Sequence, residues 1–223
     1  MASSSNTLSF LTSIFASFAF FFSWSSNFSC NFVSFSSVQD TGLSLGFGLW
    51  SHSWYAISTS LNGSIIFQAC ITYGSTPIDG MMRLARIFSS LAVIIGGTFF
   101  LKDVIGGCLN PNKRRNTRLE GLAYLMACVF QGLSLLLLDS TTVCTENQLI
   151  SEIQSEIDKN ENVQIDFDDK CSISTGARFC IVAIVFWFLA ALASCRATSA
   201  LKKEEETKVE SNMREPLVPG DIL

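Results

Sequence analysis

Four long apolar stretches divide the chain, and each is close to the length that a helix needs to cross a bilayer. They cover residues 8–24, 84–101, 119–138 and 177–195. A membrane-crossing helix uses about 20 predominantly apolar residues, with a range of roughly 17–25. The pattern therefore predicts four transmembrane helices, with long connections at 25–83 and 139–176.

The first apolar stretch also has the general character of a signal peptide. A signal peptide begins with a basic region and ends at a small-residue cleavage site. Residues 1–8 contain no Lys or Arg, the apolar run is longer than a usual signal core, and no Ala-x-Ala site follows it. We therefore expect a retained helix, with cleavage as the alternative.

The connection at 25–83 has the pattern of β-strands. Polar and apolar residues alternate over 30–35, and aromatic and β-branched residues recur between 50 and 73. Asn62-Gly63 is a suitable hairpin turn. We expect a small antiparallel sheet of about three to five strands.

The connection at 139–176 differs, because isoleucines at helical spacing predict a helix over 148–159. The acidic residues that follow, at 166–169, could bind Ca²⁺ or form a solvated loop. They lack the ligand spacing and the turn glycine of a calcium loop, which favours solvation. The predicted fold is thus an all-α membrane bundle of four transmembrane helices with a small extracellular antiparallel β-sheet.

Basic residues in short loops indicate the orientation, since they accumulate on the cytosolic side. They gather between the second and third spans and after the fourth: Lys102, Lys113, Arg114, Arg115, Arg118, Arg196, Lys202 and Lys203. Both termini are then cytosolic and both long connections face outward. Two glycosylation sequons, at Asn27 and Asn62, lie in the first outward connection, which predicts a glycoprotein. Asn62 is the better candidate because Asn27 lies close to the membrane.

The eight cysteines divide according to this topology. Cys30 and Cys70 lie in the first outer connection, and Cys144 and Cys171 lie in the second. Disulfides persist in oxidising compartments, and four cysteines allow three connectivities. We expect the most local one, Cys30–Cys70 with Cys144–Cys171. Cys195, at the inner end of the fourth span, is a candidate for palmitoylation, with ordinary packing as the alternative.

Composition narrows the function classes. Only 15% of residues are charged and the net charge is −4, so no broad basic face exists for nucleic acid. The single histidine, His52, cannot supply the paired ligands of a membrane haem carrier. The sequence has no Cys-x-x-Cys pair and no phosphate-binding glycine loop. We therefore expect no catalytic residue, no bound metal, no cofactor and no enzymatic activity.

Two further patterns concern the third helix and the tail. Ala123, Ala127 and Gln131 fall on one helix face, where small residues allow close packing and an amide can hydrogen-bond to a neighbouring helix. The alternative is that Gln131 lines a polar path. Residues 196–223 are charged and poor in aromatic residues, which predicts a disordered cytosolic tail.

Several residues together resemble the claudin superfamily of four-span membrane proteins. They are Gly48-Leu49-Trp50, the later Cys70, and Arg86 at the start of the second helix. The resemblance implies a left-handed four-helix bundle in which Gly48, Leu49, Trp50 and Arg86 anchor the outer sheet near the membrane surface. Claudins have a cysteine three residues after the tryptophan, whereas this chain has Ser53.

These patterns predict a non-enzymatic tetraspan that organises membrane domains or contacts through lateral assembly. The alternative is an auxiliary subunit that modulates a channel or transporter. The expected partners are membrane lipids and either further copies of the chain or a larger membrane protein, but no nucleic acid. The expected location is the plasma membrane, with an endomembrane as the alternative.

Overall fold

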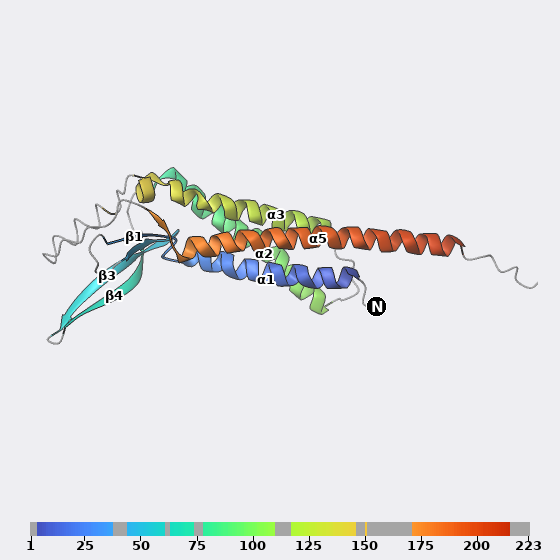
Figure 1. The fold of residues 1–223 in the computed structure, drawn as a ribbon, viewed down its shortest axis with the longest axis horizontal. Coiled ribbons are helices and arrows are strands. Elements are labelled where there is room, and N and C mark those ends of the chain that lie inside the picture. The colour runs from blue at the N-terminus through green and yellow to red at the C-terminus, as the bar shows by residue number, and fades with distance from the viewer. Residues whose placement is uncertain are drawn as a thin grey trace, which may run out of the picture.

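The computed structural model describes residues 4–37, 44–60, 63–73, 78–109, 117–145, 150 and 171–214 of the chain. Long helices run side by side, and a sheet lies at one end of them (Figure 1). The helices are α1 (Ser4–Phe28), α2 (Gly80–Leu109), α3 (Thr117–Leu133) and α5 (Thr175–Arg214), and α3 is extended by the 3-10 segment η1 (Ser134–Asp139) and the π-helical turn η2 (Thr141–Thr145). We call the end that carries the sheet the sheet end, and the opposite end the tail end.

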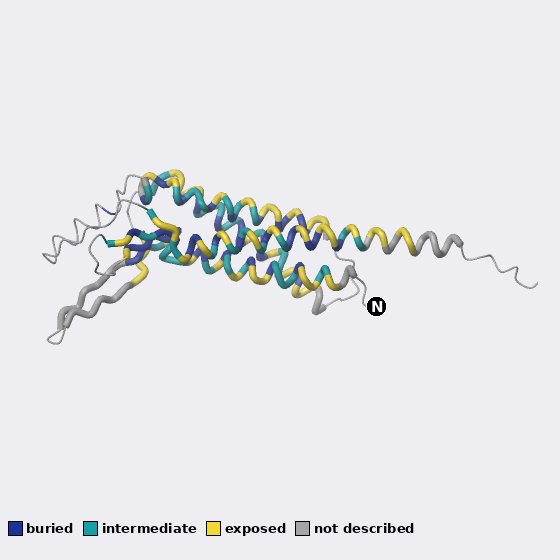
Figure 2. The backbone as a smooth tube through the Cα atoms, in the orientation of Figure 1, coloured by how far each residue is buried: buried dark blue, intermediate teal, exposed yellow. Residues whose placement is uncertain are grey.

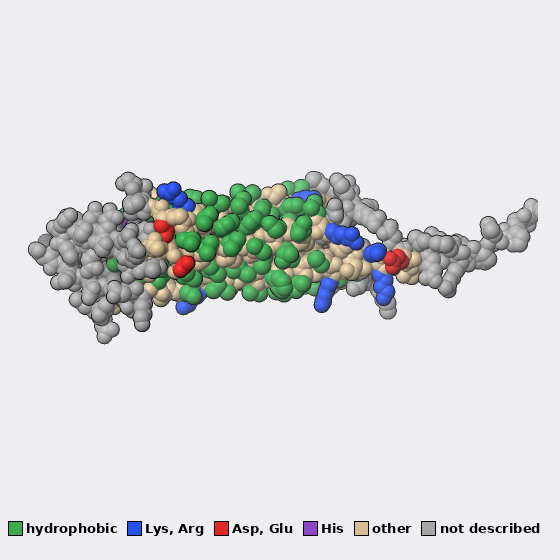
Figure 3. Space-filling view, turned by 90° about the horizontal axis from the view of Figure 1, so that it is seen from above, with side chains coloured by type: hydrophobic (Ala, Val, Ile, Leu, Met, Phe, Trp, Pro, Cys, Tyr) green, Lys and Arg blue, Asp and Glu red, His purple; other side chains and the backbone are tan. Residues whose placement is uncertain are grey.

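Four segments of the described residues are long and apolar enough to cross a membrane, which confirms the prediction of a multi-pass protein. They are Thr7–Phe28, Gly80–Gly106, Arg118–Asp139 and Thr175–Ala200. Each is longer than the predicted span. Hydrophobic side chains cover the middle of the bundle face in view, and charged side chains lie toward its two ends (Figure 3). This belt is what a hydrocarbon environment requires of a helical bundle.

The helices form a closed ring in which α1 and α3 each pack against both α2 and α5. Trp187 of α5 fills the centre: it is fully buried, stacks on Tyr124 of α3 at 5.6 Å, and donates its indole N–H to Ser23 of α1 at 2.8 Å. Gly96 of α2 makes room for this ring, because a Cβ there would overlap it. Lipid is as apolar as these side chains, so close packing of this kind holds membrane helices together.

Within the described residues, the sheet contains five antiparallel strands in the order β4-β3-β2-β1-β5. They are β1 (Val33–Ser36), β2 (Ser44–Phe47), β3 (Ser51–Ser60), β4 (Gly63–Thr72) and β5 (Ser172–Ile173). The predicted fold class is therefore confirmed, and the architecture is claudin-like. One strand was not predicted, because β5 comes from the second long connection and pairs with β1 through Val33–Ile173 and Ser34–Ser172.

One hydrophobic core joins the sheet to the bundle. Phe32, Phe35 and Phe47 are fully buried and cluster with residues at the sheet ends of the helices, among them Met82 of α2 and Ala177 of α5. Buried positions lie at the base of the sheet and along the inside of the helices (Figure 2). The sheet is thus continuous with the bundle interior.

The turn of the β3–β4 hairpin differs from the one that the sequence predicts. Ser60 pairs directly with Gly63, so Gly63 belongs to β4 and not to the hairpin turn that Asn62-Gly63 was expected to form. The helix expected over 148–159 and the acidic residues at 166–169 lie outside the described residues, apart from the buried Ile150.

The prediction of a disordered tail from residue 196 was wrong for residues 196–214, because α5 continues through them to Arg214. The charged composition suggested disorder, but Ala, Leu, Lys and Glu are also strong helix formers. Lys202 and Glu206 form an i,i+4 ion pair at 3.6 Å, which favours the helix further. Residues 215–223 lie outside the described part of the chain.

Two glycine-to-alanine changes in α2 test the central packing. Gly96→Ala should destabilise the bundle by about 1–3 kcal/mol, since the added methyl group meets a buried ring that Ser23 and Tyr124 hold in place. Gly106→Ala is the matched control, because nothing lies within 4 Å of its added Cβ. The measurement is the SDS fraction at half-unfolding in mixed micelles. Equal midpoints for the two variants would contradict the role of Gly96.

Candidate functional site

The residues that the resemblance singles out meet at the junction between the sheet and α2. The Arg86 guanidinium lies over two aromatic rings, 5.2 Å from the centre of Trp50 and 5.1 Å from the centre of Tyr73. Its Nε donates a hydrogen bond to the Leu49 carbonyl oxygen. A guanidinium stacks on aromatic faces and also donates in its own plane, a combination that an ammonium cannot reproduce. We call Gly48, Leu49, Trp50, Tyr73 and Arg86 the sheet joint.

Gly48 occupies the tightest position of the sheet joint. Its N–H donates to the Ser51 carbonyl oxygen at 2.8 Å, and its carbonyl oxygen accepts from the Tyr73 hydroxyl at 2.7 Å. A Cβ at Gly48 would overlap the Ser29 carbonyl oxygen, where the chain leaves α1. Only glycine permits this approach of two backbones.

Trp50 connects the sheet joint to α1 and α2. Its indole N–H donates to the Asn27 Oδ1 atom at 2.9 Å, and the Ser89 hydroxyl donates to the same oxygen at 3.1 Å. Asn27 is only 5% exposed and lies within α1. This burial makes Asn27 unsuitable as a glycan acceptor, contrary to the sequon, and gives its amide a structural role instead. The other sequon, Asn62, lies outside the described residues.

Tyr73 and His52 complete the buried aromatic side of the junction. Burial raises the pKa of the Tyr73 hydroxyl, so the hydroxyl stays protonated and keeps donating to Gly48. His52 is 8% exposed, with its ring 5.3 Å from that of Tyr73 and 6.1 Å from that of Phe47. His52 is therefore a packing residue of the sheet core, and not a residue of the water interface.

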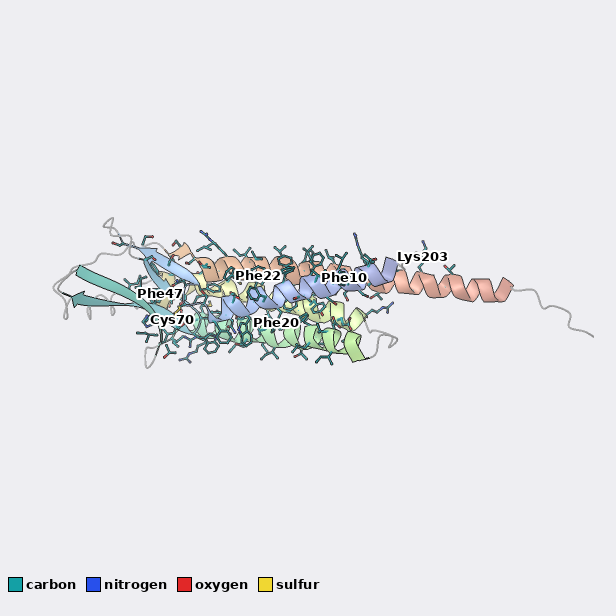
Figure 4. The ribbon with its side chains drawn as sticks, turned by 90° about the horizontal axis from the view of Figure 1, so that it is seen from below. Phe10, Phe20, Phe22, Phe47, Cys70 and Lys203 are labelled. Atoms are coloured by element: carbon teal, nitrogen blue, oxygen red, sulfur yellow. A yellow bond between two sulfur atoms is a disulfide. The ribbon has the colours of Figure 1, made fainter. Side chains whose placement is uncertain are left out.

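Two disulfides fasten the sheet end, and they join the cysteines in the most local of the three connectivities. Cys30, just after α1, is bonded to Cys70 of β4, with their Cα atoms 5.9 Å apart. Cys144 of η2 is bonded to Cys171, which precedes β5, with a Cα separation of 5.2 Å. The first bond attaches the long β3–β4 hairpin to the bundle near its base (Figure 4).

Gln131 is fully buried between α3 and α5. Its side-chain amide nitrogen donates to the Cys180 sulfur at 3.3 Å, and the Cys180 thiol donates to the main-chain carbonyl oxygen of Gln131 at 3.3 Å. The Ser134 hydroxyl donates to that same carbonyl oxygen at 2.7 Å. These contacts favour helix-to-helix packing over a polar path.

Two buried carboxylates near the tail end were missed in the sequence. Asp103 of α2 is 8% exposed and accepts from the Tyr124 hydroxyl at 2.6 Å. Glu120 of α3 is 1% exposed and pairs with the ammonium group of Lys102 at 3.5 Å. A single acidic residue inside an apolar stretch indicates that it has a partner elsewhere in the bundle. Glu120, within the predicted span 119–138, could have been recognised in this way.

The remaining candidate residue, Cys195, is an exposed free cysteine on α5 near the tail end. Its sulfur would lie 3.2 Å from a Cβ added to Gly121 of α3. Within the described residues, no three His, Cys, Asp or Glu side chains gather in a metal-binding arrangement.

Comparison with known proteins identifies no family for this chain. The sequence matches no protein-family model, and no curated protein is significantly similar to it.

The contacts of the sheet joint require a guanidinium group at position 86. Arg86→Lys should loosen the sheet, because lysine cannot stack on Trp50 and Tyr73 while donating in plane to Leu49. We expect a loss of about 1–3 kcal/mol. Faster amide hydrogen exchange in β2, measured by mass spectrometry in lipid nanodiscs, would report it.

The control for this variant is Arg83→Lys, because Arg83 lies on the same helix but is exposed. Its exchange in β2 should match that of the unmodified protein. If both lysine variants exchange at the same rate, the sheet joint does not depend on the guanidinium of Arg86.

Proposed function

We propose that this protein is a non-enzymatic organiser of membrane domains that assembles laterally with further copies of itself through the outer sheet. The observation that carries the proposal is the contrast between the two edges of the sheet. At one edge, β5 is only two residues long and offers little to pair with. At the other edge, β4 runs for ten residues and, among the residues that the structure describes, is paired on one side only.

Within its own ten residues, β4 lacks the features that keep natural sheet edges from pairing. Proteins protect such edges with lysine, proline, bulges or short strands. Gly63–Thr72 contains no charged residue and no proline, and its register with β3 is unbroken from Ser60–Gly63 to Ser51–Thr72. A strand from another chain can therefore extend the sheet by main-chain hydrogen bonding.

The register also identifies the backbone groups that face outward. Gly48 N–H bonds to the Ser51 carbonyl oxygen, so the main chain of Ser51 faces β2. Successive residues of a strand point their main-chain polar groups in opposite directions, so His52 and its partner Ile71 bond to each other. By the same alternation, the N–H of Ile66 points away from β3 to the open edge.

The attachment of the sheet suits lateral assembly. The sheet joint and the Cys30–Cys70 disulfide hold the base of the β3–β4 hairpin against the bundle. An edge held in a fixed relation to the membrane meets the same edge of a neighbour at a constant height. This lowers the entropic cost of association, because little has to be ordered on binding.

Distant membership of the claudin superfamily is part of the proposal. It is supported by the claudin-like architecture and by Gly48, Leu49, Trp50 and Arg86 meeting in one joint. The register of β3 with β4 supports the same membership. Ser53, at the place of the first claudin cysteine, lies directly opposite Cys70 on β4, whose partner here is Cys30.

A proline substitution at the open edge tests lateral assembly. Ile66→Pro removes one outward N–H without removing a donor to β3, so the sheet should form while self-association falls about tenfold. Ile66→Thr, which keeps the N–H and suits a strand, is the matched control. Photobleaching steps counted for single particles in lipid bilayers give the copy number.

Three results would decide between the functions. Loss of multimers in Ile66→Pro alone supports assembly through β4. A strictly monomeric unmodified protein without partners rules lateral organisation out. Co-purification of one larger channel or transporter at constant ratio would favour the auxiliary-subunit alternative, in which the same edge serves a different chain.

A further inference from the structure

An open cavity of about 610 Å³ lies at the tail end of the bundle, far from the sheet joint. It is bounded by the first turn of α3 and by one face of α5. Its lining consists of Arg118, Cys195, Thr198, Ser199, Lys202, Lys203 and Glu206. We call it the tail-end cavity.

The helical repeat explains why these residues line one surface. The six α5 positions follow one another at alternating intervals of three residues and one residue, so they share one face of the helix. The α5 helix continues beyond the apolar segment that ends at Ala200, whereas α3 begins at Thr117. The face of α5 therefore passes the start of α3, and the close contact of Cys195 with Gly121 brings the two helices together beside the cavity.

The lining carries a clear positive balance. Among the described lining residues, three cations (Arg118, Lys202 and Lys203) face one anion, Glu206, which leaves a net charge of +2. Lys202 is partly neutralised by its 3.6 Å ion pair with Glu206. Lys203 lies on the α5 segment at the tail end (Figure 4). Basic side chains gather at this end in the space-filling view (Figure 3).

The cavity lies at the level where a bilayer has its headgroups. Its two helices leave the apolar belt here, since their membrane-crossing segments are bounded by Arg118 and Ala200. Next to Arg118, Leu119 and Leu122 are 49% and 57% exposed on α3 and face the surroundings of the bundle. A molecule in the cavity can therefore hold its charged part against the cations while its acyl chains continue along α3.

We propose that the tail-end cavity binds the phosphorylated headgroup of an anionic phospholipid of the cytosolic leaflet, of the polyphosphorylated inositol class. Basic pockets between transmembrane helices on the cytosolic side are suited to such headgroups. The charge pattern along the sequence assigns the tail end to that side. The volume lies in the range of small-molecule sites, about 300–1,000 Å³.

The charge balance selects among anionic headgroups. A net charge of +2 is better matched by a headgroup with several phosphate charges than by the single net charge of phosphatidylserine. A soluble polyphosphate shares the same chemistry, but it gains nothing from the exposed leucines of α3. The lipid is therefore the assigned ligand, and the soluble compound is a comparison that the experiment must include.

The test uses the full chain at one copy per phosphatidylcholine nanodisc, so its outcome does not depend on lateral assembly. The probe is dioctanoyl phosphatidylinositol bisphosphate, titrated by thermophoresis. Saturable binding is expected. Lys203→Gln should weaken it about fivefold, and the triple change Arg118→Gln, Lys202→Gln and Lys203→Gln about a hundredfold.

Arg196→Gln is the matched control, because Arg196 is exposed on the same part of α5 but does not line the cavity. It should bind as the unmodified protein does, and circular dichroism should show equal helix content in all variants. If Arg196→Gln and Lys203→Gln weaken binding equally, the lipid responds to general surface charge and the proposed site is wrong. Absence of saturable binding would overturn it too.

Two comparison ligands test whether binding needs several phosphate charges and whether it needs acyl chains. Dioctanoyl phosphatidylserine should bind at least about tenfold more weakly than the inositol lipid, as fewer charges are matched. Soluble inositol trisphosphate should also bind more weakly, because it lacks the acyl chains. If it binds as tightly as the lipid, the cavity is a site for a soluble polyphosphate and the lipid assignment is wrong.

Discussion

The segment that leaves α1 passes between two glycines, and the placement of the sheet on the bundle depends on this passage. A Cβ on Gly48 would overlap the Ser29 carbonyl oxygen, and a Cβ on Gly176 would lie 2.9 Å from the Phe32 Cα atom. The Gly176 N–H donates to the Asn31 carbonyl oxygen at 2.8 Å, so the start of α5 is hydrogen-bonded to the same segment. Sheet, α1 and α5 therefore meet at backbone distance.

This close approach explains why the covalent connections lie where they do. A disulfide within the β3–β4 hairpin would only brace the hairpin itself, and Ser53 stands where such a bond to Cys70 could form. The Cys30–Cys70 bond instead ties β4 to the segment between the glycines. Cys144–Cys171 attaches the approach to β5 in the same way. Both bonds thus hold strands onto the bundle.

Features that extend over many residues were predictable from the sequence, and features carried by one or two residues were not. Spans and strands persist through apolar runs and alternation, but β5 has two residues and no pattern to detect. Asp103 fell just outside the predicted span 84–101, and Glu120 was a single acid within an apolar run, so their partners Tyr124 and Lys102 became visible only in the fold. The sheet joint could be predicted only from the family resemblance, because no pattern in the neighbouring sequence places Arg86 beside Trp50.

The 40-residue helix α5 connects the two proposed sites, because its first turn is held at Gly176 and its far part carries Lys202 and Lys203. Trp187 fixes the helix between them by contacts to α1, α2 and α3. Two copies paired through β4 would therefore hold their two tail-end cavities at the opposite membrane surface. The pair therefore carries two headgroup sites at a fixed spacing, which concentrates anionic lipid beneath it.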